Sequence, residues 1–385
     1  MSSKLRFVDH QGSEFFSTVK RRVDDYFKEN NRSKNANASM IGKTIFFMTS
    51  LVLFYGLILS NAFPLYLMLI FAILLGMTKA FIGFNVCHDA IHGAYSSKST
   101  VNKGLSLVFN FIGANAYVWS ITHNVVHHTY TNIPGHDEDI EVAPGLLRLS
   151  PEEQSTKMQK YQHFYAFFLY SLASLSWVFR KDYVKFFQKK IGNYDNSKHP
   201  KKEYFNLFFF KGLYYIIFII IPLIVLDVTW WQFLIGFILM HMAEGLVLGL
   251  VFQLAHVVEG TDFPYPNEKG NIEEAWAVHQ MRTTANFARK SKIAEFLCGG
   301  LNMQVEHHLF PKICHIHYRK LSEIVKATAE EFNVPYIEQP SFYSALKSHY
   351  KILKQMGRDA YFQTLADARE KVNSITTQKS TLDLK

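Results

Sequence analysis

Four long apolar runs constrain this chain more than any other feature of its sequence. They lie at about 44–60, 64–86, 205–226 and 230–255. Each is long enough to cross roughly 30 Å of hydrocarbon as a helix that rises about 1.5 Å per residue. A segment inside a bilayer must satisfy its own backbone hydrogen bonds, so we expect helices and not irregular structure. The sequence therefore predicts an all-α integral membrane protein with four transmembrane helices.

The runs form two pairs, each joined by a short turn, at Asn61–Pro64 and at Asp227–Thr229. Neither turn contains Lys or Arg, whereas the segments outside the pairs are rich in both. Because Lys and Arg concentrate on the cytoplasmic side, we expect two transmembrane hairpins with both termini in the cytoplasm. The predicted divisions are a cytoplasmic segment at 1–42, a membrane domain at 43–325 and a cytoplasmic segment at 326–385. A bacterial inner membrane and the endoplasmic reticulum both fit this orientation.

The net charge of +9 is also explained by the predicted topology. A basic chain invites a nucleic-acid hypothesis, but here the basic residues flank apolar runs, which favours orientation and attraction to anionic lipid over nucleic acid. Two shorter apolar stretches, 105–121 and 164–179, are interrupted by Gly, Asn or Ser. We expect them as interfacial or re-entrant helices.

Histidines gather in three clusters just beyond the predicted spans. His88 and His92 lie in HDAIH, His123, His127 and His128 in HNVVHH, and His307 and His308 in QVEHH. Side chains four residues apart share one helix face, about 5–6 Å from each other, which suits two imidazoles that converge on one metal. A single pair is weak evidence, but three clusters on one side of the membrane predict a histidine-rich metal cap in the cytoplasm.

The number of ligands indicates two metal ions. His256, at the end of the fourth run, raises the set to eight histidines, which is too many for one tetrahedral zinc. Imidazole suits iron, zinc and copper, so the ligand type does not choose among them. A site beside apolar helices, without a thiolate cluster or an HExxH motif, favours redox iron that acts on an oily substrate, with two zinc ions as the alternative.

The boxes HDAIH, HNVVHH and QVEHHLFP, in this order and between two apolar pairs, resemble the membrane fatty acid desaturase family from about Thr44 to Val325. The Gln that opens the third box is similar to the front-end subgroup, in particular to delta-6 or linoleoyl-CoA desaturases. The resemblance implies two iron ions, O2 as co-substrate and a cis double bond introduced into an acyl chain carried by coenzyme A or by a lipid. Many front-end members carry a fused cytochrome b5 domain with an HPGG motif, which this sequence lacks. A separate electron donor, a ferredoxin or a cytochrome b5, is therefore expected.

The resemblance also implies roles for single residues. The iron ligands would be His88, His92, His123, His127, His128, His256, His307 and His308. Gln304 stands where many members have histidine, and it would ligate iron directly, act through water or only shape the pocket. No catalytic side chain is expected beyond the metal ligands.

A metal-bound imidazole commonly donates its other N–H to an outer group. The candidates for this role are Asp89, Asp137, Asp139, Glu306 and His279. His241 and Glu244 lie inside the fourth run, where a charge facing lipid is costly. They would line the substrate tunnel or form a hydrogen-bonded pair between helices, and the second interpretation is slightly favoured.

Two other functions remain open at this level. A membrane di-iron hydroxylase or ketolase would use the same boxes, and its product would gain an oxygen instead of losing two hydrogens. A zinc-binding membrane receptor or transporter would hold metal without turnover.

Overall fold

The computed structural model describes residues 5–9, 13–140, 143, 145–149 and 156–359. This part of the chain is mostly helical, and each of its strands has two residues. Four helical stretches are long and apolar enough to cross a membrane: Ala38–Leu59, Leu65–Ile91, Lys201–Val225 and Trp230–His256. The prediction of a mostly helical chain with four candidate spans is confirmed, and the bent pair Ser99–Phe111 with Ala116–Tyr130 passes the same test of length and composition. The end of the predicted C-terminal segment, 360–385, lies outside the described residues.

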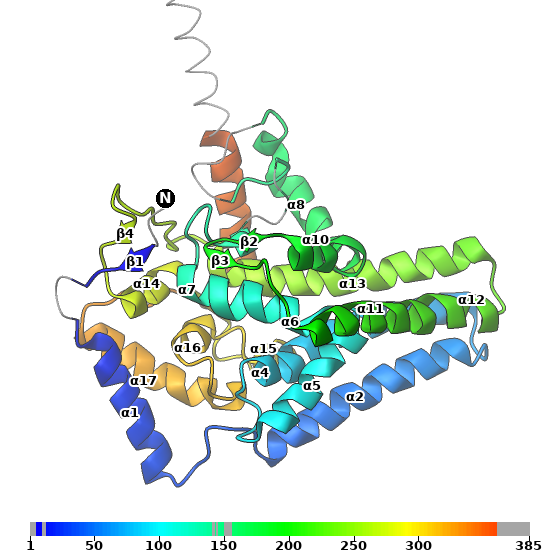
Figure 1. Ribbon diagram of the computed structural model, residues 1–385, viewed down its shortest axis with the longest axis horizontal. Helices are drawn as coiled ribbons and strands as arrows, with labels where there is room; N and C mark the ends of the chain where they lie inside the picture. Colours follow the sequence, from blue (N-terminus) through cyan, green and yellow to red (C-terminus); the bar gives the residue numbers. More distant parts are fainter. Residues whose placement is uncertain (1–4, 10–12, 141–142, 144, 150–155, 360–385) are drawn as a thin grey trace, which may run out of the picture.

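The candidate spans pack side by side at one end of the molecule (Figure 1). Helix α2 (Ala38–Leu59) lies along α3 (Leu65–Ile82), and α3 lies along α13 (Trp230–His256). The third span consists of α11 (Lys201–Tyr215), the π-helical turn η6 (Ile216–Ile220) and α12 (Ile221–Val225). Gly76 makes the close approach of α3 to α13 possible, because a Cβ at this position would collide with the carbonyl of Met240.

The two shorter apolar stretches do not run straight through the bundle. The first contains α5 (Ser99–Phe111), which is bent by 110° from the helical stretch Ala116–Tyr130. Gly113 lies at this bend with φ +111°, and a Cβ there would clash with Tyr214 and Val178. The second stretch contains α8 (Gln162–Ser171), which packs across α13. It continues as α9 (Ala173–Ser176), the π-helical turn η5 (Trp177–Lys181) and α10 (Asp182–Phe187).

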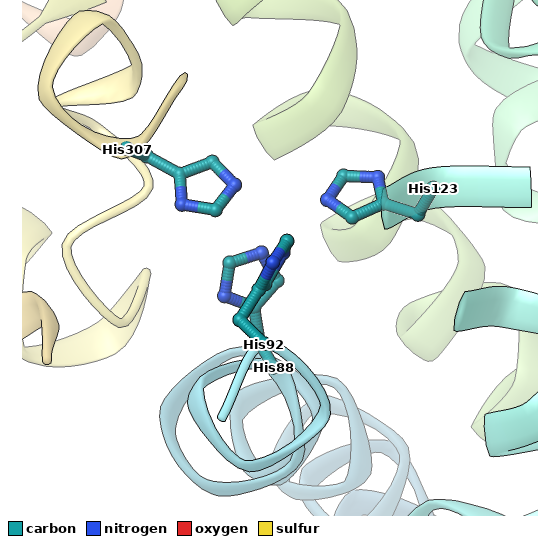
Figure 2. Close-up of side chains that lie close together, drawn as sticks. All are labelled: His88, His92, His123 and His307. Carbon is teal, nitrogen blue, oxygen red and sulfur yellow. The ribbon is translucent and has the colours of Figure 1, made fainter. Parts of the chain in front are cut away.

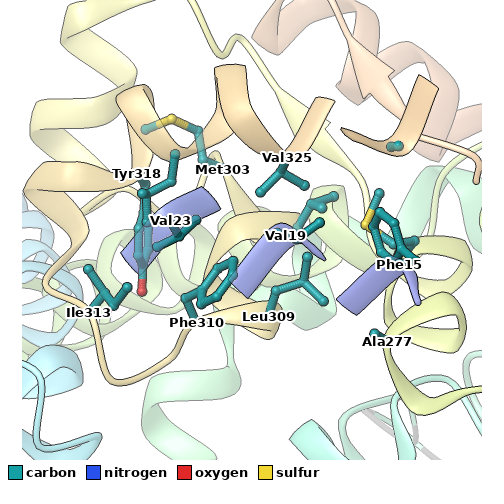
Figure 3. Packing of buried hydrophobic residues seen from close by; sticks show 14 of the residues in the cluster. Phe15, Val19, Val23, Ala277, Met303, Leu309, Phe310, Ile313, Tyr318 and Val325 are labelled. Atoms are coloured by element: carbon teal, nitrogen blue, oxygen red, sulfur yellow. The ribbon is translucent and has the colours of Figure 1, made fainter. Parts of the chain in front are cut away.

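The other end of the molecule is a helical cap, which packs against the ends of the spans. Phe15, Val19 and Val23 on one face of α1 (Phe15–Glu29) are buried against Leu309 and Phe310 (Figure 3). Burial of this apolar face is the main force that holds α1 against the rest of the cap. The other cap helices are α14 (Trp276–Thr283), α15 (Lys292–Leu297), α16 (Gln304–Leu309) and α17 (Tyr318–Glu331), and residues 342–359 are also helical.

Short strand pairs tie distant segments together. β1 (Arg6–Phe7) pairs in parallel with β4 (Asn271–Ile272), and β5 (Asn286–Phe287) with β6 (Glu338–Gln339). β2 (Lys190–Ile191) and β3 (Tyr194–Asp195) form an antiparallel hairpin. The remaining short elements are the π-helical turns η1 (Gly83–Cys87) and η2 (Ser120–His127), the helices α4 (His88–Ile91), α6 (Ala116–Trp119) and α7 (His128–Tyr130), and the 3-10 turns η3 (Glu138–Ile140), η4 (Gln159–Tyr161) and η7 (His315–His317).

Candidate metal centre

The eight predicted histidines meet where the spans join the cap. They come from four separate parts of the chain: α4 and the residue after it, the η2–α7 segment, the end of α13, and α16. Each is at most 9% exposed. Such a concentration of buried imidazoles is costly to assemble unless the rings share a partner.

The eight rings divide into two groups and one ring between them. His88, His92, His123 and His307 each offer a nitrogen, and these four nitrogens lie within 4.8 Å of one another (Figure 2). His127, His256 and His308 form a second group by the same measure. The ring of His128 lies between the groups, with its centroid 4.8 Å from that of His92 and 4.3 Å from that of His308.

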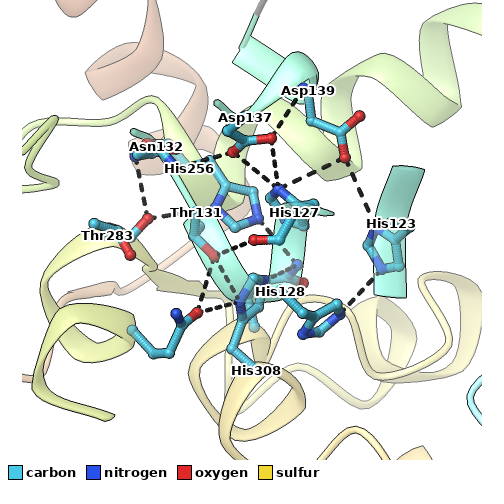
Figure 4. A network of polar contacts seen from close by, with 12 residues as sticks. His123, His127, His128, Thr131, Asn132, Asp137, Asp139, His256, Thr283 and His308 are labelled. Atoms are coloured by element: carbon cyan, nitrogen blue, oxygen red, sulfur yellow. Dashed lines mark hydrogen bonds and ion pairs between the residues drawn. The ribbon is translucent and has the colours of Figure 1, made fainter. Parts of the chain in front are cut away.

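A π-helical turn distributes the second histidine box between these groups. Residues 120–127 form η2, and one turn of a π-helix closes over five residues instead of four. The Nε2 atoms of His123 and His128, five residues apart, are therefore only 3.2 Å from each other. His127 faces the second group instead, and its carboxylate partners are shown in Figure 4. The i,i+4 spacing suggests that His123 and His127 share one site. In the structure His123 groups with His88, His92 and His307, and His127 with His256 and His308, while both also lie near Asp139.

Several of these rings are held by one nitrogen and present the other inward. His127 Nδ1 lies 3.0 Å from an oxygen of Asp137, and His307 Nδ1 lies 3.2 Å from the hydroxyl of Tyr318. In the described part of the chain, the Nε2 atoms of both rings are buried without a hydrogen-bond partner, as are the Nε2 atoms of His88 and His92. Buried nitrogens without partners that converge on common points are what a metal site requires, so these residues fit metal ions.

Two further rings are fixed in the same way. His308 Nδ1 lies 2.7 Å from the amide oxygen of Gln280, and His256 Nδ1 lies 3.3 Å from the carbonyl oxygen of Thr283. An acceptor at Nδ1 places the proton on that nitrogen and leaves the Nε2 lone pair free for a metal.

Burial and the neighbouring imidazoles together hold the pKa values of His307 and His308 well below the usual range. Both rings are therefore neutral at physiological pH, which is the form that binds metal. Burial alone would raise the pKa of Asp137, but the His127 ring and the backbone N–H groups of Asn132 and Asp139 hold it below its usual value. Asp137 is thus an anion beside His127.

The other predicted outer residues lie in different surroundings. An oxygen of Asp139 is 3.7 Å from His123 Nδ1 and 3.6 Å from His127 Nδ1. A carboxylate oxygen of Asp89 lies 2.9 Å from Nδ1 of His315. The distance from Asp89 to Nδ1 of His88 is longer, at 3.9 Å.

The short contacts of Glu306 and His279 are with residues other than the eight clustered histidines. Glu306 accepts hydrogen bonds from Asn286 and Tyr336, and burial raises its pKa to about 7. Nε2 of His279 lies 2.9 Å from the carbonyl oxygen of Thr131, and its Nδ1 lies 3.3 Å from Glu274.

The amide group of Gln304 lies at the second histidine group. Its nitrogen is 3.1 Å from Nε2 of His256 and 3.3 Å from Nε2 of His308, and its oxygen has no partner in the described part of the chain. A 180° turn of the amide exchanges nitrogen and oxygen. The amide oxygen would then face the point on which the two imidazoles converge.

His241 and Glu244 belong to a polar network inside the bundle. His241 lies 2.7 Å from the hydroxyl of Ser174 and 2.8 Å from that of Tyr214. Glu244 accepts hydrogen bonds from Lys79 at 2.8 Å and from Ser174 at 2.6 Å. The network joins α3, α9, α11 and α13, so both residues face the bundle interior.

Sequence reasoning missed several residues that hold the clustered rings. The contacts of His308 with Gln280 and of His256 with Thr283 join residues far apart in the sequence. Tyr318 is closer to its partner, since it follows His307 by eleven residues. Asn132 donates its side-chain amide to the carbonyl of His256 at 2.9 Å. The sequence offers no spacing rule for such contacts, because they form only when distant helices pack.

Comparison with known proteins gives a consistent result. The family model described as fatty acid desaturase matches residues 26–340. The chain is 36% identical to the sn-1 linoleoyl-lipid 6-desaturase of Synechocystis sp., over 93% of this chain and 99% of that protein. It is 35% identical to the sn-1 linoleoyl-lipid 6-desaturase of Arthrospira platensis, over 92% and 95%. It is 33% identical to the acyl-lipid (8-3)-desaturase of Physcomitrium patens, over 92% and 74%.

Proposed function

This chain belongs to the fatty acid desaturase family, and we propose that the eight clustered histidines of this fatty acyl desaturase hold two iron ions. As a desaturase it is an oxidoreductase, and it is similar to front-end relatives along most of its length. The hydroxylase, ketolase, receptor and transporter interpretations find no support among the relatives named above. The observation that carries the proposal is the set of buried imidazoles whose nitrogens gather in two groups, four of them without a hydrogen-bond partner in the described part of the chain.

The first ion would be held by His88, His92, His123 and His307, and the second by His127, His256 and His308. His128 lies between the two groups and would complete one or both sites. Gln304 would contribute its amide oxygen to the second ion. Bound iron, with O2 as co-substrate, would supply the oxidising power to remove two hydrogens from unactivated methylenes, which no side chain provides.

The protein's own residues would fix the ligands and keep the site dry. Asp137 and Tyr318 hold the tautomer and orientation of His127 and His307 by accepting or sharing a proton at Nδ1. Trp119 stacks on His123 with ring centroids 4.2 Å apart, and its ring also lies 5.6 Å from that of Phe109. Trp119 and Phe109 belong to a buried apolar cluster beside the first histidine group and would give a methylene chain an apolar surface to lie against.

The substrate would be an acyl chain that already contains a double bond and is esterified to a membrane lipid. Two of the relatives quoted above are named linoleoyl-lipid 6-desaturases and the third an acyl-lipid desaturase, and these names support a lipid carrier over coenzyme A. The new cis double bond would lie on the carboxyl side of the existing one, at the delta-6 position.

The site would lie on the cytoplasmic side of a multi-pass protein, with the spans arranged as hairpins at 44–60 with 64–86 and at 205–226 with 230–255. The segments 1–42 and 326–385 would flank the membrane domain 43–325 on that same side. A separate one-electron carrier, a ferredoxin or a cytochrome b5, would supply electrons.

The proposal is tested by expressing the chain in a host fed linoleic acid and analysing fatty-acid methyl esters by gas chromatography and mass spectrometry. The expected result is a product two mass units lighter than linoleate, with derivatisation placing the new bond at delta-6. The matched control is His307→Ala, which should insert in the membrane and form no product. A new bond on the methyl side would contradict the front-end assignment, and the same product from the His307→Ala variant would contradict the site.

A further inference from the structure

A basic and aromatic surface lies where α11 begins. The ribbon shows the start of α11 close to α6 and α10 (Figure 1), and β2 contacts η2, the segment that carries the second histidine box. It is built from α10, the β2–β3 hairpin and the first two turns of α11. Residues 180–203 carry eight Lys or Arg and three Asp or Glu. None of the charged residues discussed below touches the histidine cluster, so the surface needs an explanation of its own.

The surface is a folded element with fixed internal contacts. The Asn196 side-chain amide donates to the backbone carbonyls of Lys185 and Gln188, both at 2.8 Å. Nε2 of His199 lies 2.8 Å from the carbonyl oxygen of Phe186, and the His199 and Phe186 rings stack with centroids 4.2 Å apart. Asn196 and Phe186 are buried. The charges on this element therefore keep a defined arrangement.

Most of its lysines are exposed, and Asp195 is the acidic neighbour of two of them, Lys190 and Lys198. Five lysines are exposed and form no ion pair within the described part of the chain: Lys189, Lys190, Lys198, Lys201 and Lys202. Nearby lysines that serve the fold behave differently. Lys185 pairs with Glu138, and the buried Lys211 pairs with Asp182 at 2.7 Å. The five outward lysines are thus available to an external anion.

Apolar side chains lie beside these lysines. Val184, Phe187, Tyr204, Phe205 and Phe208 are between 39% and 63% exposed. The ring of Phe187 lies 6.4 Å from those of Tyr204 and Phe208, so α10 and α11 share one aromatic face. Aromatic residues beside lysines at the start of a span are typical of the layer where headgroups meet hydrocarbon.

We propose that this basic–aromatic surface, formed by the five lysines and five apolar residues named above, binds the anionic headgroups of bilayer lipids. The lysines would contact phosphate or sulfonate oxygens, while Phe187, Phe205 and Phe208 would insert among the first methylenes of the acyl chains. The aromatic face favours a lipid over an acidic protein carrier, because it continues directly into a helix that enters the hydrocarbon. This inference is independent of the desaturation reaction.

The test uses the full chain purified in neutral maltoside micelles and titrated with fluorescent phosphatidylglycerol or phosphatidylcholine. Wild type should bind phosphatidylglycerol more tightly. Changing the five lysines to Gln should weaken phosphatidylglycerol binding by about tenfold or more and leave phosphatidylcholine binding unchanged. Changing the same five to Arg should preserve binding, since the charge is kept.

The matched control changes five lysines elsewhere on the described chain to Gln, all exposed and without an ion pair in that part: Lys20, Lys28, Lys269, Lys312 and Lys347. It removes the same net charge and should bind phosphatidylglycerol as wild type does. Equal weakening in this control would show that only net charge matters and would overturn the proposal. So would a five-Gln surface variant that binds phosphatidylglycerol normally but no longer binds an acidic ferredoxin, because the surface would then serve the electron donor.

Discussion

Two buried polar clusters in this protein differ in whether their side chains have hydrogen-bond partners. In the network around Glu244, His241 has a partner at each ring nitrogen, and Glu244 accepts from Lys79 and Ser174. In the histidine cluster, the Nε2 atoms of four rings have no partner within the described residues, although these rings are equally buried. A satisfied network stabilises the packing of helices, whereas a cluster with unused nitrogens at its centre is organised for a ligand. Contacts alone, without reference to sequence motifs, thus distinguish His241 from His88, His92, His127 and His307.

The largest effect should follow from removing an inward nitrogen. His127→Ala leaves the second group with two imidazoles and Gln304, so activity should fall by more than about 100-fold and bound iron should fall with it. Product formation in membranes and iron per folded chain measure the two effects. His241→Ala is the control, since it removes a histidine of the satisfied network and should leave the iron content of the folded protein unchanged. A loss of iron in His241→Ala would break the comparison.

The next effect should be on stability. Lys79 is fully buried and pairs with Glu244, which is nearly so. Lys79→Met would leave the Glu244 carboxylate without its cation, at a cost of about 3–5 kcal/mol in the free energy of unfolding. Unfolding in detergent, followed by circular dichroism, measures this loss.

The double change Lys79→Met with Glu244→Leu should recover most of that stability, because it removes both charges. Iron bound per folded chain should stay the same in both variants. If the double variant were no more stable than the single one, the pair would not be acting through its charges.

A smaller effect, on iron affinity, should come from changing Asp137, which contacts the proposed ligand His127. Asp137→Asn keeps the size of the side chain but removes the negative charge beside His127 Nδ1. Iron affinity should fall by about 10–100-fold, measured by competition with a chelator. Glu306→Gln, which changes a buried carboxyl that contacts Asn286 and Tyr336 instead of an imidazole, should retain wild-type affinity. Equal losses in both variants would show that buried charge in general, and not contact with a ligand, controls the affinity.

The smallest effect is expected at Gln304. Gln304→His replaces a neutral amide by an imidazole, which is a stronger ligand, so iron should remain bound and activity should change only modestly. The comparison is sharpened by Gln304→Leu, which offers no donor atom and should lower iron content at the second group. Wild-type iron content in Gln304→Leu would remove this residue from the proposed ligand set.

Much of the fold follows from the sequence because hydrocarbon imposes simple rules. Runs of about twenty apolar residues predicted the four candidate spans. The interruptions near Gly113 predicted an interfacial or re-entrant helix at 105–121, and the structure has a bend of 110° there. The histidine boxes were recognisable because side chains four residues apart share a helix face.

The rest depends on packing that no local pattern encodes. The π-helical turn at 120–127 directs His123 toward His88, His92 and His307 and His127 toward His256 and His308, although both also lie near Asp139. Gln280, Thr283 and Tyr318 reach the clustered rings from other segments, so only the folded chain reveals them. Asp89 and Glu306 are adjacent in sequence to histidines of the boxes, yet their short contacts are with His315, Asn286 and Tyr336.

The central claim is that eight histidines hold two iron ions in one chain. The most direct measurement is Mössbauer spectroscopy on the full chain purified after growth with isotopically labelled iron, together with the metal content per folded protein. We expect two iron ions per chain, both high-spin with nitrogen-rich coordination, and a loss of signal in His127→Ala but not in His241→Ala. A folded chain that carries zinc, or a single iron ion, while it still desaturates an acyl chain would contradict it.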